Sequence, residues 1–285
     1  MRTYFKNLIR RFIDNLIGYI TNIGEIRRRL DIGIDAYWNE KRRHAKNPFI
    51  RFGEKYFSQN DEDGIILEIT KRMDLKNGVF VEFGCGNGLE NNSIILLFRG
   101  WRGVWIGNVD LAIQISSTER LNFIKAWVLI ENCVGLLTEG LQQISAASMN
   151  VLSIDLDGND YYFLAELLAR GCNPDLIIVE YNGKFPPPIS FVVPYCAERQ
   201  WDLTDNFGAS IQAFCDLMQP YQYSLVCCNL TGTNAFFVKS SYLHLFPEIP
   251  RDIGDIFVPA DYNWFFRRGH KVSPATIERA FLQGK

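Results

Sequence analysis

The chain has 285 residues, with 30 Lys and Arg, 32 Asp and Glu and 3 His, so its formal net charge is −2 at pH 7. Apolar residues make up 47% and charged residues 22%, which fits a globular protein and excludes a disordered or collagen-like chain. The sequence shows no apolar run of spanning length, no signal-peptide layout and no CxxC pair among its 7 Cys. We therefore expect a cytoplasmic protein with reduced thiols, built as one large domain with an appendage or as two small domains.

Charge is distributed unevenly along the chain. Residues 1–57 hold 13 Lys and Arg against 6 Asp and Glu, whereas the remainder holds 17 against 26. A basic arm on an acidic body suggests contact with an anionic surface or partner, and a solvated helical arm is the alternative. Nucleic acid is not an expected partner, because no recognition motif accompanies the basic charge.

Apolar residues in this arm repeat with the 4-3 spacing of a helical seam. The seam positions are Phe5, Ile9, Phe12, Leu16, Tyr19, Ile23, Ile26 and Leu30. Neighbouring apolar residues widen this stripe, so another surface must cover it. We expect residues 1–57 to form a helical arm that drives homo-oligomerisation. Packing on the chain's own body and peripheral contact with a membrane surface are alternatives. A second helix is expected after residue 31, ending before Pro48.

The body, residues 58–242, alternates short apolar strands with helices. Strands are expected at Val79–Phe83, Gly103–Ile106, Ala126–Ile130, Val151–Ile154, Leu176–Val179, Tyr223–Cys227 and Ala235–Val238. Helices are expected at Asn91–Phe98, Tyr161–Arg170 and Ser210–Met218. This alternation predicts an α/β, Rossmann-like, mostly parallel sheet with helices on both faces, and an antiparallel pair of late strands at one edge. Residues 243–285 show no clear period and are expected to form a loop-rich cap or tail.

The first expected strand leads into a glycine-rich turn that contains Gly84, Gly86 and Gly88. Ligands of such sheets bind at the carboxyl ends of the strands, and glycines let the backbone approach a ligand closely. Glu82 lies two residues before the first glycine, where it would meet a cationic ligand group and not a pyrophosphate. Leu89 also fits a dinucleotide-binding turn poorly. Together these features resemble motif I of class I S-adenosylmethionine-dependent methyltransferases.

Further motifs follow in an order similar to that of the FkbM-like methyltransferases. They are Ser58–Ile65, the strand and turn above, Gly100–Gly103, Ile154–Tyr162, Val179–Asn182, Phe207–Ser210 and Gly232–Phe237. The resemblance covers roughly residues 55–240 and implies S-adenosylmethionine as the cofactor. It also implies that Gln59, Glu82 and Gly84 surround the methionine part of the cofactor, and that Glu131 and Asn132 lie near the adenine.

The second expected strand departs from this family pattern. Such strands normally end in an acidic residue that holds the ribose hydroxyls, whereas here Asn108 takes that place. Asn108 can hydrogen-bond a ribose without charge assistance, and Asp110 reaches the ribose only if the turn is tight. We expect weaker cofactor binding or a remodelled ribose contact, and a non-catalytic relative stays open.

Acidic residues gather at the ends of two further strands. Asp155, Asp157 and Asp160 follow the fourth expected strand, and Glu180 and Asn182 follow the fifth. Crowded carboxylates repel unless they bind a cation or share protons, and oxygen ligands suit Mg²⁺ or Mn²⁺. We expect Asp157, Glu180 and Asn182 to bind a divalent metal, with Asp155 or Asp160 in support. The alternative is that Asp155 contacts the cofactor and that the Asp157–Asp160 segment is a turn and helix cap.

These features predict an S-adenosylmethionine-dependent O-methyltransferase that acts on a sugar hydroxyl of a glycan. The metal would orient the hydroxyl and lower its pKa, and Asp160 or Asp155 would accept the proton. Three alternatives remain: a natural-product O-methyltransferase of the same fold, a non-catalytic glycan-binding or scaffold relative, and, less favoured, an NAD-dependent oxidoreductase.

Overall fold

The computed structural model of the chain describes residues 24–26, 28–115, 120–262 and 272–282, and it divides the chain into two units, Met1–His44 and Ala45–Lys285. In the first unit, residues 28–44 form a helix that runs past residue 31 without a break. Seam positions before residue 24 lie outside the described residues. Ile26 and Leu30 are 58% and 51% exposed in the single chain. Residues 45–57 lie in the larger unit, so the unit boundary follows His44.

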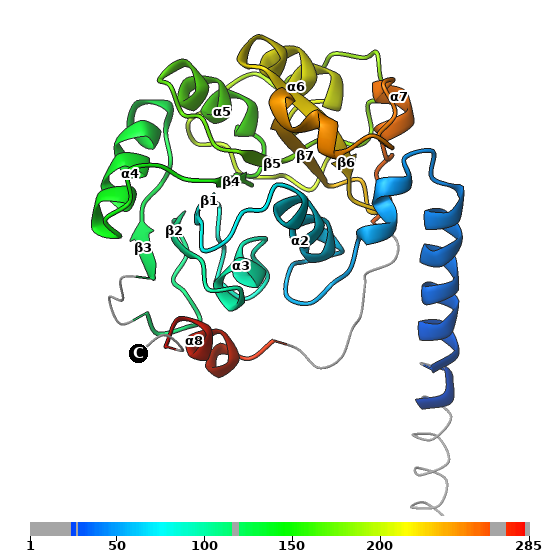
Figure 1. Cartoon of the computed structure of the whole chain (residues 1–285), viewed down its shortest axis with the longest axis horizontal. Coiled ribbons are helices and arrows are strands. Elements are labelled where there is room, and N and C mark those ends of the chain that lie inside the picture. Colours follow the sequence, from blue (N-terminus) through cyan, green and yellow to red (C-terminus); the bar gives the residue numbers. More distant parts are fainter. Residues whose placement is uncertain (1–23, 27, 116–119, 263–271, 283–285) are drawn as a thin grey trace, which may run out of the picture. The chain divides into compact units, whose positions relative to one another are not determined.

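The larger unit is built on one seven-stranded sheet, shown in Figure 1. Its strands are β1 (Val79–Phe83), β2 (Arg102–Gly107), β3 (Leu121–Lys125), β4 (Val151–Ile154), β5 (Leu176–Glu180), β6 (Tyr223–Cys228) and β7 (Asn234–Lys239). Their order is β3-β2-β1-β4-β5-β7-β6, in which the first five strands are parallel and β7 is antiparallel to both β5 and β6. The predicted Rossmann-like fold, with its antiparallel pair at one edge, is confirmed.

Helices cover both faces of this sheet. They are α2 (Glu62–Arg72), α3 (Ile94–Phe98), α4 (Ile130–Gln143), α5 (Asp160–Ala169), α6 (Ile211–Met218), α7 (Ile253–Ile256) and α8 (Pro274–Leu282), with 3₁₀ turns η1 (Pro48–Phe52), η2 (Gln219–Tyr221) and η3 (Ser240–Leu245). Figure 1 shows α4, α5 and α6 on one side of the sheet and α2, α3 and α8 on the other. Among the described residues, no helix is long and apolar enough to cross a bilayer.

The central strands are apolar on both faces because helices bury both of them. Every residue of β1 and β4 is buried, as are the first four residues of β5. Because β1, β2, β4 and β5 run parallel, their carboxyl ends lie together at one edge of the sheet. Because β7 is antiparallel, its first residue, Asn234, pairs with Glu180 and reaches the same edge.

One predicted element is misplaced. The third strand is Leu121–Lys125 and not Ala126–Ile130, and helix α4 begins at Ile130. As an edge strand with a single neighbour, β3 is only partly buried, so it lacks the continuous apolar run of a central strand. The more apolar segment Ala126–Val128 instead lines a cavity beside the sheet. Because β3 ends at Lys125, residues 126–128 line this cavity, and not the residues that follow the expected strand end at Ile130.

Candidate functional site

The glycine turn after β1 lies against the end of β4. Gly84 has φ +84°, and a Cβ on it would stand 1.5 Å from the carbonyl oxygen of Asp155. Only glycine fits this close approach of two backbones. Gly86 has φ +49° and no atom within 4 Å of its Cβ position, so it faces open space. The turn thus places an open backbone surface next to Asp155.

Glu82 fixes the segment that enters α3. Its carboxylate accepts hydrogen bonds from the backbone N–H groups of Asn92 (2.9 Å) and Ser93 (3.1 Å), and from the Ser93 hydroxyl. Burial raises the pKa of Glu82, and the bonds from Ser93 and Asn92 oppose that increase. Glu82 therefore has a structural role in addition to lining the cavity beside the glycine turn.

Three cavities open at this edge of the sheet. The β2-side cavity, of about 460 Å³, has Asn108 and Trp127 in its wall. The glycine-turn cavity, of about 190 Å³, is lined in part by Gln59. The β5-side cavity, of about 340 Å³, is lined in part by Glu180 and Gln59. Asp155 lines all three cavities, so they meet at the end of β4.

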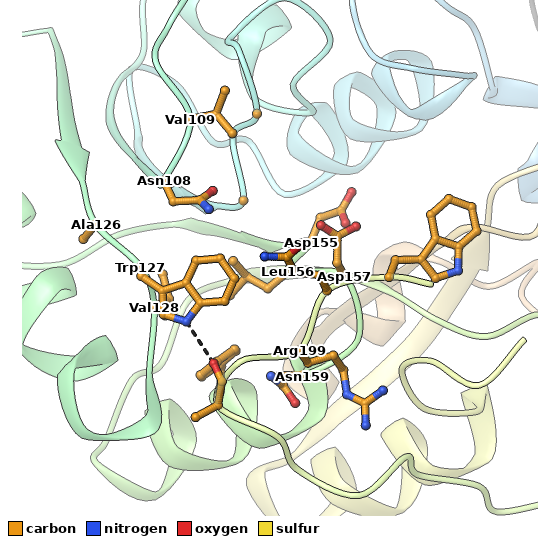
Figure 2. Close-up of a pocket in the computed structure, with 17 residues that line it drawn as sticks. Asn108, Val109, Ala126, Trp127, Val128, Asp155, Leu156, Asp157, Asn159 and Arg199 are labelled. Carbon is orange, nitrogen blue, oxygen red and sulfur yellow. Dashed lines mark hydrogen bonds between the residues drawn. The ribbon is translucent and has the colours of Figure 1, made fainter. Parts of the chain in front are cut away.

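The wall of the β2-side cavity is shown in Figure 2. Asn108, at the end of β2, faces the cavity across from the Trp127 side chain. The indole nitrogen of Trp127 donates to the carbonyl oxygen of Ala197 at 2.9 Å, which holds the ring in place. Asp110 is instead paired with Lys125 at 2.5 Å and does not line this cavity.

Glu131 and Asn132 lie in the first turn of α4 and line none of the three cavities. The Asn132 carboxamide accepts from the backbone N–H of Leu129 (2.8 Å) and donates to the carbonyl oxygen of Trp127 (3.0 Å). Asn132 therefore caps α4 and holds Trp127. The resemblance implied that Glu131 and Asn132 lie near the adenine. In the structure Trp127 and Val128 line the cavity instead, because the strand ends five residues earlier than expected.

The long loop between β5 and α6 covers this edge of the sheet. Its Trp201 lines both the β2-side and the β5-side cavities. Arg199 lines the β2-side cavity and donates to the carbonyl oxygens of Pro194 (3.0 Å) and Asn206 (3.3 Å). Among the described residues that line the three cavities, Arg199 is the single basic side chain, whereas Glu82, Glu90, Asp155, Asp157 and Glu180 are acidic. The combined site therefore favours a cationic ligand group.

Asp155 and Glu180 form a coupled carboxyl pair at the ends of β4 and β5. Burial, and then the neighbouring carboxylates, raises the pKa of both groups well above the ordinary range. A hydrogen bond between the two side chains contributes to the raised pKa of Glu180. Burial also raises the pKa of Asp157, which lines both large cavities. Carboxyl groups this close share a proton, so the pair can accept or release one.

Asp160, an expected catalytic base, is engaged below the surface of the site. Its carboxylate accepts from the backbone N–H groups of Leu156 (2.7 Å) and Gly158 (3.0 Å). Burial raises the pKa of Asp160 to about 6, and the backbone hydrogen bonds oppose this increase. Asp160 is fully buried and lines none of the three cavities, so it shapes the turn that presents Asp155 and Asp157.

Asn182 is also fully engaged. Its amide nitrogen donates to the carbonyl oxygens of Asp205 (2.8 Å) and Phe207 (2.9 Å), and its oxygen accepts from the backbone N–H of Lys184 (3.1 Å). It lines none of the three cavities. Within the described part of the chain, no cluster of three His, Cys, Asp or Glu side chains is arranged to hold a metal ion. Of the residues expected to bind a metal, Asn182 is engaged with the backbone, whereas Asp157 and Glu180 line the β5-side cavity.

A buried acid positions Gln59. The carboxylate of Asp63 accepts from the backbone N–H groups of Tyr56 (2.7 Å), Phe57 (2.6 Å) and Ser58 (2.9 Å). Burial raises the pKa of Asp63 to about 6, and these hydrogen bonds oppose the increase. The clamp fixes the segment before α2, and Gln59 lines the glycine-turn and β5-side cavities.

Two residues that line the cavities had no expected site position. Trp127 lines the β2-side cavity because β3 ends at Lys125, and an edge strand of this kind has no clear periodic pattern. Asn234 lines the glycine-turn cavity because β7 runs antiparallel. The Gly232–Phe237 motif was the one available indication for Asn234.

Comparisons with known proteins find similarity to solved structures alone. No family model and no curated protein matches the sequence. The chain is similar to a family 2 O-methyltransferase protein from Planctomyces limnophilus in complex with apigenin (14% identity, TM-score 0.34), with 57% of this chain and 50% of that chain covered. It is also similar to a putative hemolysin from Lactococcus lactis (11% identity, TM-score 0.40), with 75% of this chain and 93% of that chain covered. A third similar structure is the pyocyanin biosynthetic protein PhzM (12% identity, TM-score 0.34), with 60% of this chain and 53% of that chain covered. The chain thus spans about half the length of the O-methyltransferase and of PhzM.

Proposed function

We propose that the protein is an S-adenosylmethionine-dependent methyltransferase that transfers the methyl group to a sugar hydroxyl. The observation that carries the proposal is the meeting of three cavities at Asp155. A two-part cofactor would lie across the β2-side and glycine-turn cavities, and an acceptor would lie in the β5-side cavity. The transferred group would then be at the point where the cavities meet.

The charges around the glycine turn favour a sulfonium cofactor over a dinucleotide. Glu82, Glu90 and Asp155 line this cavity, and no basic side chain among the described residues does so. A pyrophosphate would be repelled here, whereas a sulfonium and an ammonium group would be attracted. Asn108 and the Trp127 ring line the β2-side cavity, where they would contact a ribose and a purine, respectively.

The β5-side cavity has the chemistry of a sugar site. Its wall combines the aromatic side chains of Trp201, Phe207 and Tyr262 with polar Gln59, Asn60, Thr231 and Thr233. Aromatic rings suit the apolar face of a pyranose, and amides and hydroxyls suit its hydroxyl groups. This mixture supports a glycan acceptor.

The Asp155–Glu180 pair supplies the base that the reaction needs. A sugar hydroxyl must lose its proton as it attacks the methyl carbon, and a carboxylate with a raised pKa is a stronger base than an ordinary one. Asp155 lies where the cofactor and acceptor would meet, so it accepts the proton, and Glu180 holds the shared proton beside it. Each cavity also positions its ligand for in-line transfer. No step is assigned to a metal: Asn182, one of the three predicted ligands, is bonded to the backbone, and the described residues hold no cluster of three His, Cys, Asp or Glu side chains arranged for a metal ion.

We also propose that the arm joins copies of the chain. Ile26, Leu30 and Ile32 are 58%, 51% and 70% exposed in the single chain. The first two belong to the predicted apolar seam, which a second copy of the helix would cover.

The test of the proposed reaction is methyl transfer itself. Purified protein is incubated with methyl-labelled S-adenosylmethionine and a panel of mono- and oligosaccharides, and labelled sugar is measured by mass spectrometry. Transfer to a sugar oxygen that depends on Asp155 supports the proposal. Cofactor binding without transfer to any sugar, but with transfer to a phenolic or amine acceptor, would contradict the sugar assignment alone.

A further inference from the structure

The amide of Asn234 is held in one orientation. Its nitrogen donates to Oε1 of Glu62 at 3.1 Å. The same Glu62 oxygen accepts from the Asn229 amide nitrogen at 2.7 Å, and the other Glu62 oxygen accepts from the backbone N–H of Asn60 at 2.8 Å. An ionised carboxylate only accepts hydrogen bonds, so the nitrogen of Asn234 must face Glu62. The Asn234 oxygen therefore lies on the side away from that carboxylate.

The turn that carries Asn234 is fixed as well. The Asn229 side-chain oxygen accepts from the backbone N–H groups of Thr233 and Asn234, both at 2.9 Å. The Asn229 amide nitrogen donates to the Thr231 hydroxyl at 2.8 Å in addition to Glu62. Glu62, Asn229 and Asn234 are 0%, 0% and 4% exposed, so this network is part of the core.

The oxygen of Asn234 is left without a partner. Within the described residues it is buried and makes no hydrogen bond, although Asn234 lines the glycine-turn cavity. A buried acceptor that lacks a donor is destabilising, so such atoms in native proteins are commonly satisfied by a ligand or a water. The acidic side chains that line this cavity are those of Glu82, Glu90 and Asp155. A positively charged group with several N–H donors fits this environment.

We infer that Asn234 accepts a hydrogen bond from an ammonium group bound in the glycine-turn cavity, and that Glu62 is the positioning residue that directs the Asn234 oxygen toward it. This inference rests on the proposed function, because the ammonium is then that of the methionine part of S-adenosylmethionine. It assigns a role to the Gly232–Phe237 motif, which links the antiparallel edge of the sheet to cofactor recognition.

The test compares the wild-type protein, Asn234→Ala and a control variant in their binding of two ligands. S-adenosylhomocysteine keeps the ammonium group and has no transferable methyl, and its deaminated analogue lacks only the ammonium. The wild-type protein should bind S-adenosylhomocysteine at least about tenfold more tightly than the analogue in calorimetry. Asn234→Ala should weaken binding of S-adenosylhomocysteine by about tenfold and change binding of the analogue by less than about twofold. Asn122→Ala, which removes an amide outside the three cavities, should change neither.

Glu62 is tested by the same comparison. Glu62→Ala should reproduce the loss for S-adenosylhomocysteine alone. Glu62→Gln should restore part of it, because its amide oxygen can still accept from Asn234, while its amide nitrogen replaces the oxygen that accepts from the backbone N–H of Asn60. If Asn234→Ala does not fold, as judged by thermal melting, the wild-type preference and Asn234→Ser decide the question. Equal binding of both ligands by the wild type, or an equal loss of both in the variants, overturns the role of Asn234. No binding of any adenosyl ligand by the folded wild type overturns the proposed function as well.

Discussion

Asp155 and Glu180 stand at the ends of neighbouring parallel strands, and their side chains share a hydrogen bond at the point where three cavities meet. Burial and neighbouring carboxylates raise the pKa of both carboxyl groups. Each group, when ionised, is therefore a stronger base than an ordinary carboxylate. The pair is the chemical centre of the proposed reaction.

Substitutions in this acidic cluster should have different effects. Asp155→Asn removes the base, so the methyl-transfer rate should fall about 10²- to 10⁴-fold. Asp157→Asn removes a neighbouring carboxylate that raises the pKa of Asp155, so that pKa should fall. The acid limb of the pH–rate profile should then move to lower pH, with a smaller loss of maximal rate. An acid limb that stays in place in Asp157→Asn would contradict this effect of Asp157 on Asp155.

The two glycines of the turn form a matched pair of positions. Alanine at Gly84 would collide with the backbone of Asp155, whereas alanine at Gly86 meets no atom within 4 Å. Both positions have positive φ, which costs an alanine about 1–2 kcal/mol. We expect Gly86→Ala to fold with about that loss in the free energy of unfolding and with weaker cofactor binding. Gly84→Ala should lose more than about 3 kcal/mol or fail to fold. Equal stability of the two variants in urea denaturation would be inconsistent with the close approach.

Asp160 predicts a pH dependence of stability. Its pKa is raised to about 6 from an ordinary value of 3.8, so the folded state binds this proton more tightly than the unfolded state does. The stabilisation is fully present below the unfolded pKa and is lost as pH rises through about 6, with a maximal change on the order of 3 kcal/mol. Asp160→Asn stays neutral at every pH. Its free energy of unfolding should therefore fall less steeply between pH 4 and pH 7 than that of the wild type, whereas parallel curves would count against this assignment.

The arm makes a separate prediction. Deletion of residues 1–30 should lower the mass measured by light scattering, because it removes the predicted seam. A finer test places charges on the seam with Phe12→Asp and Leu16→Asp, and compares them with Asn7→Asp and Asn15→Asp off the seam. The seam variants alone should dissociate the assembly. An unchanged mass in the two seam variants would refute self-association through this predicted helix.

The fold was predictable where burial on both faces leaves a clear pattern in the sequence. The predicted bounds of β1 and β4 are those observed. Apart from Glu82 in β1, neither strand contains a charged residue, and Gly84 and Asp155 mark where the two strands end. β3 was not, because an edge strand such as Leu121–Lys125 needs no continuous apolar run. The error carried through to Glu131 and Asn132, which cap α4 and line no cavity.

The site was predictable in part for a related reason. Gly84, Asn108 and Asp155 line the cavities because strand ends position them, and strand ends can be located in a sequence. The hydrogen bonds that engage Asp160 and Asn182 could not be predicted from the sequence, because their partners are backbone groups of a turn and of a long loop. Carboxylate and amide spacing alone does not distinguish a metal ligand from a residue that satisfies backbone groups.

The decisive measurement for the proposed function is a calorimetric titration of the purified protein with S-adenosylmethionine, in Mg²⁺ and again in EDTA. We expect one site per chain with a dissociation constant in the micromolar range, and the same affinity in both buffers. Absence of binding by folded protein in either buffer would contradict the methyltransferase assignment. Binding that required Mg²⁺ would show that a metal belongs to the site after all.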